Sequence, residues 1–61
     1  MTNYEYIKNM PIEEMADFIR EIAYYEDDTT PMLGMWVDGK HKSLRCRKDE
    51  IEKWLNSEKE G

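Results

Sequence analysis

Residues 35–46 have the sequence MWVDGKHKSLRC, and the Asp38-Gly39 pair inside it predicts a hairpin. Asp-Gly is a favoured pair for a two-residue turn between antiparallel strands, because both central residues of that turn need a positive φ angle. We therefore expect a two-stranded antiparallel hairpin over residues 33–46. The turn sets its register, with Val37 opposite Lys40, Trp36 opposite His41, Met35 opposite Lys42 and Leu33 opposite Leu44.

The two faces of this hairpin differ in character, because side chains alternate along a strand. The more apolar face, which we expect to meet the helices, carries Leu33, Met35, Val37, Leu44 and Cys46, with Lys40 and Lys42 near the tip. The other face carries Gly34, Trp36, His41, Ser43 and Arg45. An exposed tryptophan beside arginine is typical of binding hot spots. We predict that partner binding on this side of the hairpin involves Trp36, His41, Arg45 and Arg47.

The segments before the hairpin have helical patterns. Thr2 and Glu5 have the spacing of a capping box, which predicts a short helix over residues 3–8. Pro11 suits the first position of a longer helix, which we expect to end near Tyr25. Its apolar stripe consists of Ile12, Met15, Ala16, Ile19, Ile22 and Ala23. The following EDDTTP segment, residues 26–31, is predicted to be a loop.

After the hairpin, residues 48–57 have the pattern of a closing helix with one apolar patch, formed by Ile51, Trp54 and Leu55. The predicted fold is therefore a single small α+β domain over residues 1–61: short helix, longer amphipathic helix, two-stranded hairpin and C-terminal helix. We expect the core to form where Ile19, Ile22, Trp54 and Leu55 meet the apolar face of the hairpin.

The charge of the chain is unevenly distributed. Residues 1–31 hold eight acids and two bases, a net charge of −6, whereas residues 32–61 hold six acids and seven bases, a net charge of +1. Glu14, Asp17 and Glu21 lie mostly outside the apolar stripe of the longer helix. They either serve solubility or form an acidic face that docks on a basic surface. Direct binding of nucleic acid is disfavoured at an overall net charge of −5.

The sequence predicts no metal site, cofactor or enzymatic activity. Cys46 and His41 are the only cysteine and histidine, and the predicted register points them to opposite faces of the hairpin. A structural zinc site needs four ligands, and a cysteine nucleophile needs a histidine within hydrogen-bonding reach. No apolar stretch approaches the ~18–20 residues of a membrane span. With no signal-peptide pattern at the start, we expect a cytoplasmic protein.

Two stretches carry a resemblance to a known group of proteins. Residues 3–18 match the pattern N-Y-E-x-I-K-x-M-x-I-E-E-M-A-x-F, and residues 46–58 match C-x-x-x-x-I-x-x-W-L-x-x-E. Together they resemble a family of short phage and prophage proteins. Relatives in that family carry several central cysteines that resemble a zinc knuckle, of which this chain keeps only Cys46. The resemblance implies an origin in a phage of a Gram-positive bacterium but no zinc site here.

Small acidic phage proteins without enzymatic motifs often inhibit host machinery, including CRISPR effectors and other defence components. By analogy, we expect a binding protein that occludes the surface of a host protein in the bacterial cytoplasm. Two alternatives remain open at this point. One is an oligomeric sponge for a nucleotide signal, with Trp36 stacking on the base and Arg45 or Arg47 on the phosphate. The other is a non-inhibitory phage accessory protein, and a homodimer is compatible with any of these.

Overall fold

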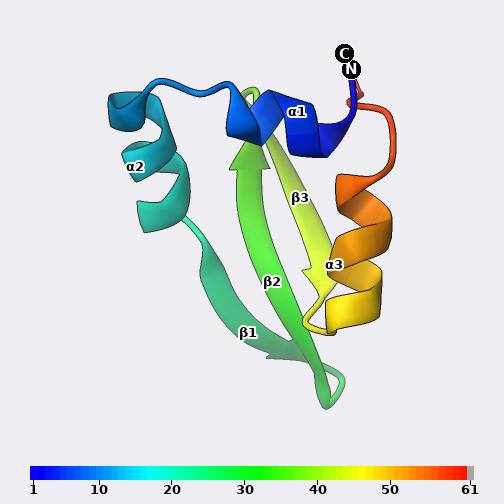
Figure 1. Ribbon diagram of the computed structural model, residues 1–61. Coiled ribbons are helices and arrows are strands. Elements are labelled where there is room, and N and C mark those ends of the chain that lie inside the picture. The colour runs from blue at the N-terminus through cyan, green and yellow to red at the C-terminus, as the bar shows by residue number, and fades with distance from the viewer. Residues whose placement is uncertain (61) are drawn as a thin grey trace.

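The computed structural model describes residues 1–60 and confirms the α+β class, with three helices around an antiparallel sheet (Figure 1). In chain order the elements are α1 (Asn3–Lys8), α2 (Ile12–Arg20), β1 (Ala23–Asp27), β2 (Thr30–Val37), β3 (Lys40–Arg45) and α3 (Lys48–Leu55). The sheet has the order β1-β2-β3. It therefore has three strands, and the prediction of a two-stranded hairpin was wrong in strand number.

The β2–β3 hairpin has the predicted register. Asp38 and Gly39 both have positive φ angles, 53° and 78°, as the two-residue turn requires. Trp36 pairs with His41, and Leu33 pairs with Leu44. Met35 therefore points to the face that α3 and α1 cover, and it is only 5 % exposed. Trp36 points to the opposite face and is 49 % exposed, which confirms the predicted division of the hairpin.

The first strand, β1, replaces the last part of the predicted long helix. Helix α2 ends at Arg20, where the N–H of Glu21 donates to the carbonyl of Asp17 and the N–H of Ile22 donates to the carbonyl of Ile19. The chain then pairs with β2, and the hydroxyl of Tyr25 donates a 2.7 Å hydrogen bond to the Ser43 hydroxyl on β3. A strand that pairs along its length, with a side-chain bond reaching the third strand, outweighs the weak helical preference of this segment.

The loop predicted over residues 26–31 is a second tight turn. Asp28 and Thr29 have φ angles of 50° and 68°, so they form the same kind of turn as Asp38-Gly39. No glycine marks this position, and a positive φ angle is uncommon for β-branched residues such as threonine. Without a glycine signal for this turn, β1 was missed, and β2 was predicted to begin at residue 33 rather than at Thr30.

One face of the sheet is covered by α3, which packs on β3, and by α1, which packs beside α3. Asn3 joins these two helices from a buried position, since it is 4 % exposed. Its side-chain amide donates a 2.8 Å hydrogen bond to the carbonyl of Trp54, and its backbone N–H donates to the carbonyl of Ser57. The predicted core residues Trp54 and Leu55 are half-buried on this side.

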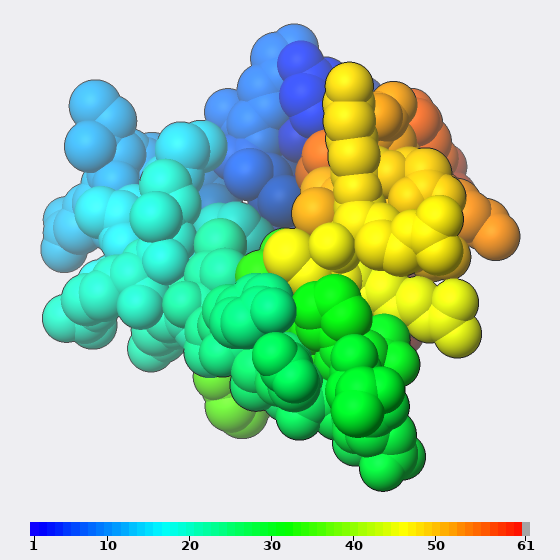
Figure 2. Space-filling view, turned by 90° about the horizontal axis from the view of Figure 1, so that it is seen from below, coloured from blue at the N-terminus to red at the C-terminus, as the bar shows by residue number. Residues whose placement is uncertain are grey.

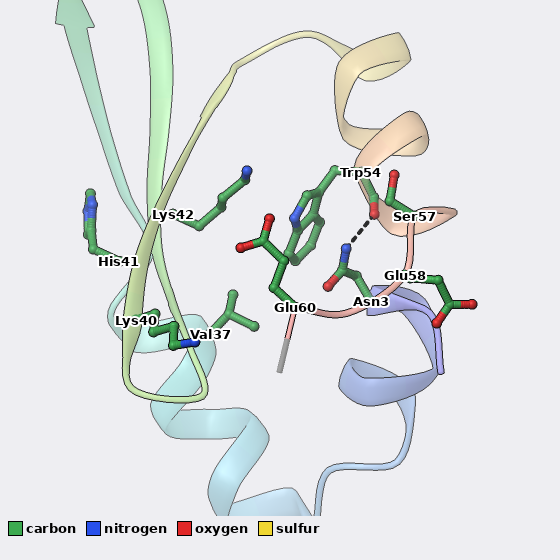
Figure 3. Close-up of a pocket in the computed structure, with 9 residues that line it drawn as sticks. All are labelled: Asn3, Val37, Lys40, His41, Lys42, Trp54, Ser57, Glu58 and Glu60. Atoms are coloured by element: carbon green, nitrogen blue, oxygen red, sulfur yellow. Dashed lines mark hydrogen bonds between the residues drawn. The ribbon is translucent and has the colours of Figure 1, made fainter.

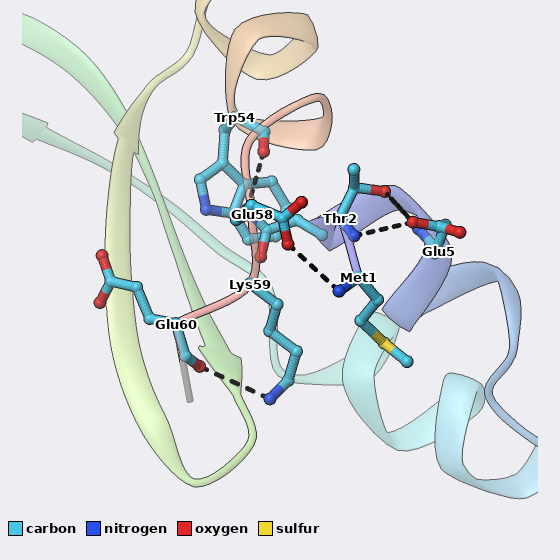
Figure 4. Close-up of polar contacts among 8 residues, drawn as sticks. Met1, Thr2, Glu5, Trp54, Glu58, Lys59 and Glu60 are labelled. Carbon is cyan, nitrogen blue, oxygen red and sulfur yellow. Dashed lines mark hydrogen bonds and ion pairs between the residues drawn. The ribbon is translucent and has the colours of Figure 1, made fainter.

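The two ends of the described chain are joined by polar contacts (Figure 4). Thr2 and Glu58 form an isolated antiparallel bridge, and the N–H of Lys59 donates to the carbonyl of Met1. The Met1 ammonium lies 3.1 Å from the Glu58 carboxylate. Beside this bridge, Glu5 completes the predicted capping box with Thr2, and α1 has its predicted bounds. These contacts hold α1 and the C-terminal segment together.

Helix α2 lies apart from this core, in line with β1 and next to the C-terminal half of β2 (Figure 1). Phe18 and Met15 are half-buried, whereas Ile12 is 89 % and Ile19 is 59 % exposed. Ile22 also remains exposed. The prediction that Ile19 and Ile22 belong to the core was wrong, because a nine-residue helix at the edge of a small sheet covers only one side of its apolar stripe.

The first prediction concerns the core. Met35→Ala should lower the free energy of unfolding by about 2–4 kcal/mol, because it removes a buried side chain and leaves a cavity. Ile19→Ala, measured at low micromolar concentration, should change it by less than about 0.5 kcal/mol, because the side chain is exposed. Urea denaturation followed by circular dichroism measures both. A larger effect from Ile19 than from Met35 would contradict the core described above.

The second prediction concerns the capping box. Hydrogen bonds from the Thr2 backbone N–H and hydroxyl lower the pKa of Glu5. A lowered pKa in the folded state means that the carboxylate stabilises the fold at neutral pH, and that this contribution is lost as the pH falls through the lowered value. Glu5→Gln should therefore lower the melting temperature at pH 7, and its difference from the unmodified protein should shrink on acidification.

Glu52→Gln is the matched control, because Glu52 is exposed and makes no side-chain hydrogen bond or ion pair within residues 1–60. Its melting curve should track that of the unmodified protein across the acidic range. An equal and pH-independent loss in both variants would show that the capping box does not carry the effect.

Candidate functional site

An open groove of about 440 Å³ lies between α2 and the tip of the β2–β3 hairpin. The end of α1 closes it on a third side. Four of its lining residues are acidic and three are aromatic. The full lining is Tyr6, Met10, Glu14, Asp17, Phe18, Glu21, Trp36, Asp38 and Gly39.

The acidic wall of the groove comes from α2 and follows from helical spacing. Glu14, Asp17 and Glu21 are three and four residues apart, so they share one face of the helix. Phe18 lies at the edge of that face, is half-buried and also lines the groove. The opposite wall comes from the hairpin tip, where the turn places Trp36 and Asp38.

Trp36 is held by neighbours on the outer face of the sheet. The His41 ring meets it edge-to-face, with ring centroids 5.1 Å apart and an interplanar angle of 69°. Gly34 allows this packing, because a Cβ atom there would lie 3.0 Å from Nε2 of His41 and 3.3 Å from a ring carbon of Tyr25. The ring of Trp36 therefore has a defined position although half of its surface is exposed.

The groove has an excess of negative charge. Asp38 pairs with Lys59 at 3.0 Å, and Asp17 pairs with Arg20 at 3.5 Å. Glu14 and Glu21 have no ion-pair partner within the described residues 1–60. Two uncompensated carboxylates beside an exposed indole ring form a surface that attracts cations and repels phosphate.

The structure brings together residues from two surfaces that were predicted separately, the acidic face of the longer helix and the outer face of the hairpin. Glu14, Asp17, Glu21 and Trp36 line one groove, and His41 supports it through its contact with Trp36. Arg45 and Arg47 are exposed but lie outside this lining, and Arg47 is paired with Asp49.

Several groove residues were missed from the sequence. No binding role was predicted for Tyr6, Met10 or Phe18, and Asp38 was assigned only to its turn. The sequence does not reveal that these residues line one groove, because α1, α2 and the hairpin approach one another only in the folded chain. The one available signal was that Asp38 and Gly39 follow Trp36 closely at the predicted hairpin tip.

The two sides of the molecule also differ in charge. In Figure 2, α2 and β1 form one side, and β3 with the start of α3 forms the opposite side. The first side carries acids, including Glu26 and Asp27 on the free edge of β1. The second carries the basic residues Lys40, Lys42, Arg45, Arg47 and Lys48. The groove therefore lies in an acidic half of the surface.

A smaller cavity of about 190 Å³ lies between β3 and the C-terminal segment (Figure 3). The ring of Trp54 faces it from one side and Val37 from the other. Lys40 and Lys42 contribute positive charge, whereas Glu58 and Glu60 contribute negative charge. This mixed lining selects no single class of ligand, so the acidic groove is the stronger candidate site.

Residues 1–60 contain no group of three or more His, Cys, Asp or Glu side chains placed to hold a metal ion. The thiol of Cys46 is free and half-buried. Within the same residues, no helix has the length and apolar character needed to cross a membrane. The groove offers carboxylates and aromatic rings for contact with a ligand.

Comparison with known proteins adds no relative. No family model matches this chain, and neither a curated protein nor a solved structure matches it.

Proposed function

We propose that this protein is a phage-encoded binding protein that inhibits a host protein by occupying one of its basic surfaces. A CRISPR effector or another defence component is the expected target. The observation that carries this proposal is the groove in which Glu14, Glu21 and Trp36 converge. The phage origin rests on the motif resemblance of residues 3–18 and 46–58.

The groove fits an arginine side chain of the target. A guanidinium group is planar and stacks on an indole ring, while its N–H donors pair with carboxylates at the edge of the ring. Glu14 and Glu21 stand on one wall of the groove and Trp36 on the other. A cation between the walls would meet both kinds of partner at once.

The proposed inhibition rests on the targets that expose arginine and lysine side chains, which include proteins that bind nucleic acid. Proteins that hold nucleic acid present arginine and lysine to the phosphate backbone, and these contacts supply much of their affinity. An acidic protein that binds the same side chains competes with nucleic acid without any catalysis. The phosphate-repelling charge around Trp36 disfavours the alternative in which this ring stacks on a nucleotide.

The third prediction tests the groove directly. A short arginine-rich peptide should shift the NMR signal of the Trp36 indole N–H, because the guanidinium stacks on that ring. The Trp54 indole signal should stay in place, since Trp54 lies on the other side of the sheet. The affinity should fall as salt is raised, because the contact is largely electrostatic. Glutamate-rich peptides and nucleotides should leave both signals unchanged.

Matched variants locate the contact. Glu14→Gln should weaken peptide binding about two- to fivefold, in line with one exposed ion pair, whereas Glu13→Gln should not, because Glu13 does not line the groove. Trp36→Ala should weaken binding about five- to thirtyfold, and Tyr24→Ala, an exposed aromatic outside the groove, should not. Equal losses in both members of either pair would reject the groove as the binding site.

The fourth prediction tests inhibition. Expression of the protein in a bacterium with active CRISPR immunity should restore plaque formation by a targeted phage. The Trp36→Ala variant should fail to do so, and the Tyr24→Ala variant should succeed, with equal protein levels confirmed by immunoblot. If peptide binding is intact but no CRISPR or other defence system is relieved, the inhibitory role is contradicted while the groove remains a cation-binding site.

A further inference from the structure

Helix α2 presents two faces that differ in both chemistry and direction. One face carries Glu14, Asp17 and Glu21 into the groove. The other carries a row of apolar residues, Ile12, Ala16 and Ile19, spaced four and three residues apart and exposed to solvent. We call this row the α2 ridge. Helix α2 itself lies at the periphery of the molecule (Figure 1).

The α2 ridge is unusual for an isolated small domain. Ile12 and Ile19 are 89 % and 59 % exposed, and a contiguous exposed apolar patch is a candidate interaction surface. The core beneath the sheet is thin, with Met35 as its buried hydrophobic residue. Domains of about this size often depend on association for part of their stability. The exposed ridge and the thin core both favour a partner that covers the ridge, and the neighbouring charges indicate which partner this is.

The charges beside the α2 ridge identify the partner as a second copy of this chain. Glu13 and Arg20 flank the ridge on one side, and they are separated by about 10 Å along the helix, too far to pair with each other. When two identical helices pack antiparallel, the same flank of each helix meets. Glu13 of one copy then lies beside Arg20 of the other, and the reverse pair forms at the opposite end.

We propose that the protein forms a homodimer in which two α2 helices pack antiparallel through the α2 ridge. Ala16 lies at the crossing point, where a small side chain allows close approach. Ile12 packs against Ile19 of the second copy, and two Glu13–Arg20 ion pairs border the contact. Such an interface is self-complementary and closes after two copies, as twofold symmetry requires.

The dimer is expected to be weak. A nine-residue helix is only about 14 Å long, so the contact is smaller than a standard protein interface. In the free chain Arg20 pairs with Asp17, but both side chains are highly exposed and that pair is easily exchanged. The groove lies on the opposite face of α2, so each copy in the dimer keeps its groove open. The dimer does not depend on what the groove binds.

Analytical ultracentrifugation from about 10 μM to about 1 mM should show a reversible monomer–dimer equilibrium. Ile19→Glu should raise the dissociation constant at least about tenfold, because it places two carboxylates in the contact. Tyr24→Glu introduces the same charge at an exposed position outside the ridge and should leave the equilibrium unchanged. Circular dichroism should show that both variants fold. A protein that is monomeric at about 1 mM would overturn the proposal.

Charge exchange tests the antiparallel geometry. Glu13→Arg and Arg20→Glu should each weaken the dimer at least about tenfold, because like charges then meet at both ends. The double variant, and an equimolar mixture of the two single variants, should restore association. Glu14→Arg is the matched control, since it makes the same change in the same helical turn on the groove face, and it should dimerise normally. Failure of the double variant to recover would reject the antiparallel α2 contact.

Discussion

The two-residue turn at Asp38-Gly39 is the constraint on which the rest of the structure depends. Its positive φ angles allow only one register for the β2–β3 hairpin. That register sends Met35 into the core and Trp36 to the opposite face. A slip of one residue would exchange the two faces and expose the apolar side of the sheet. The position of the turn therefore decides both what stabilises the fold and what is available for binding.

Lys59 connects this turn to the remainder of the molecule. Its ammonium lies 3.0 Å from the carboxylate of Asp38 and 4.9 Å from the centre of the Tyr6 ring. The side chain is only 14 % exposed, so these contacts are screened less than those of an ordinary surface pair. The C-terminal segment thereby links α1 to the hairpin tip. Such polar and cation–π contacts supplement a core that contains little buried apolar volume.

Helix α2 separates the two binding functions that we propose. Its acidic face and Trp36 form the groove, whereas Ile12 and Ile19 on its other side form the ridge. Because the faces point in different directions, a dimer through the ridge would display two grooves. Two grooves on one particle can engage two cationic sites of a large target, which raises the effective affinity of individually weak contacts.

Local chemistry in the sequence determined the β2–β3 register and the bounds of α1, because turns and caps depend on neighbouring residues. The tertiary structure alone decided that Ala23–Asp27 is a strand, because its pairing with β2 across the Asp28-Thr29 turn, which lacks a glycine, outweighs the helical pattern of this segment. It also decided which side of α2 is covered. The acidic residues and Trp36 were recognisable separately, but only packing of α2 beside β2 brings them into one groove.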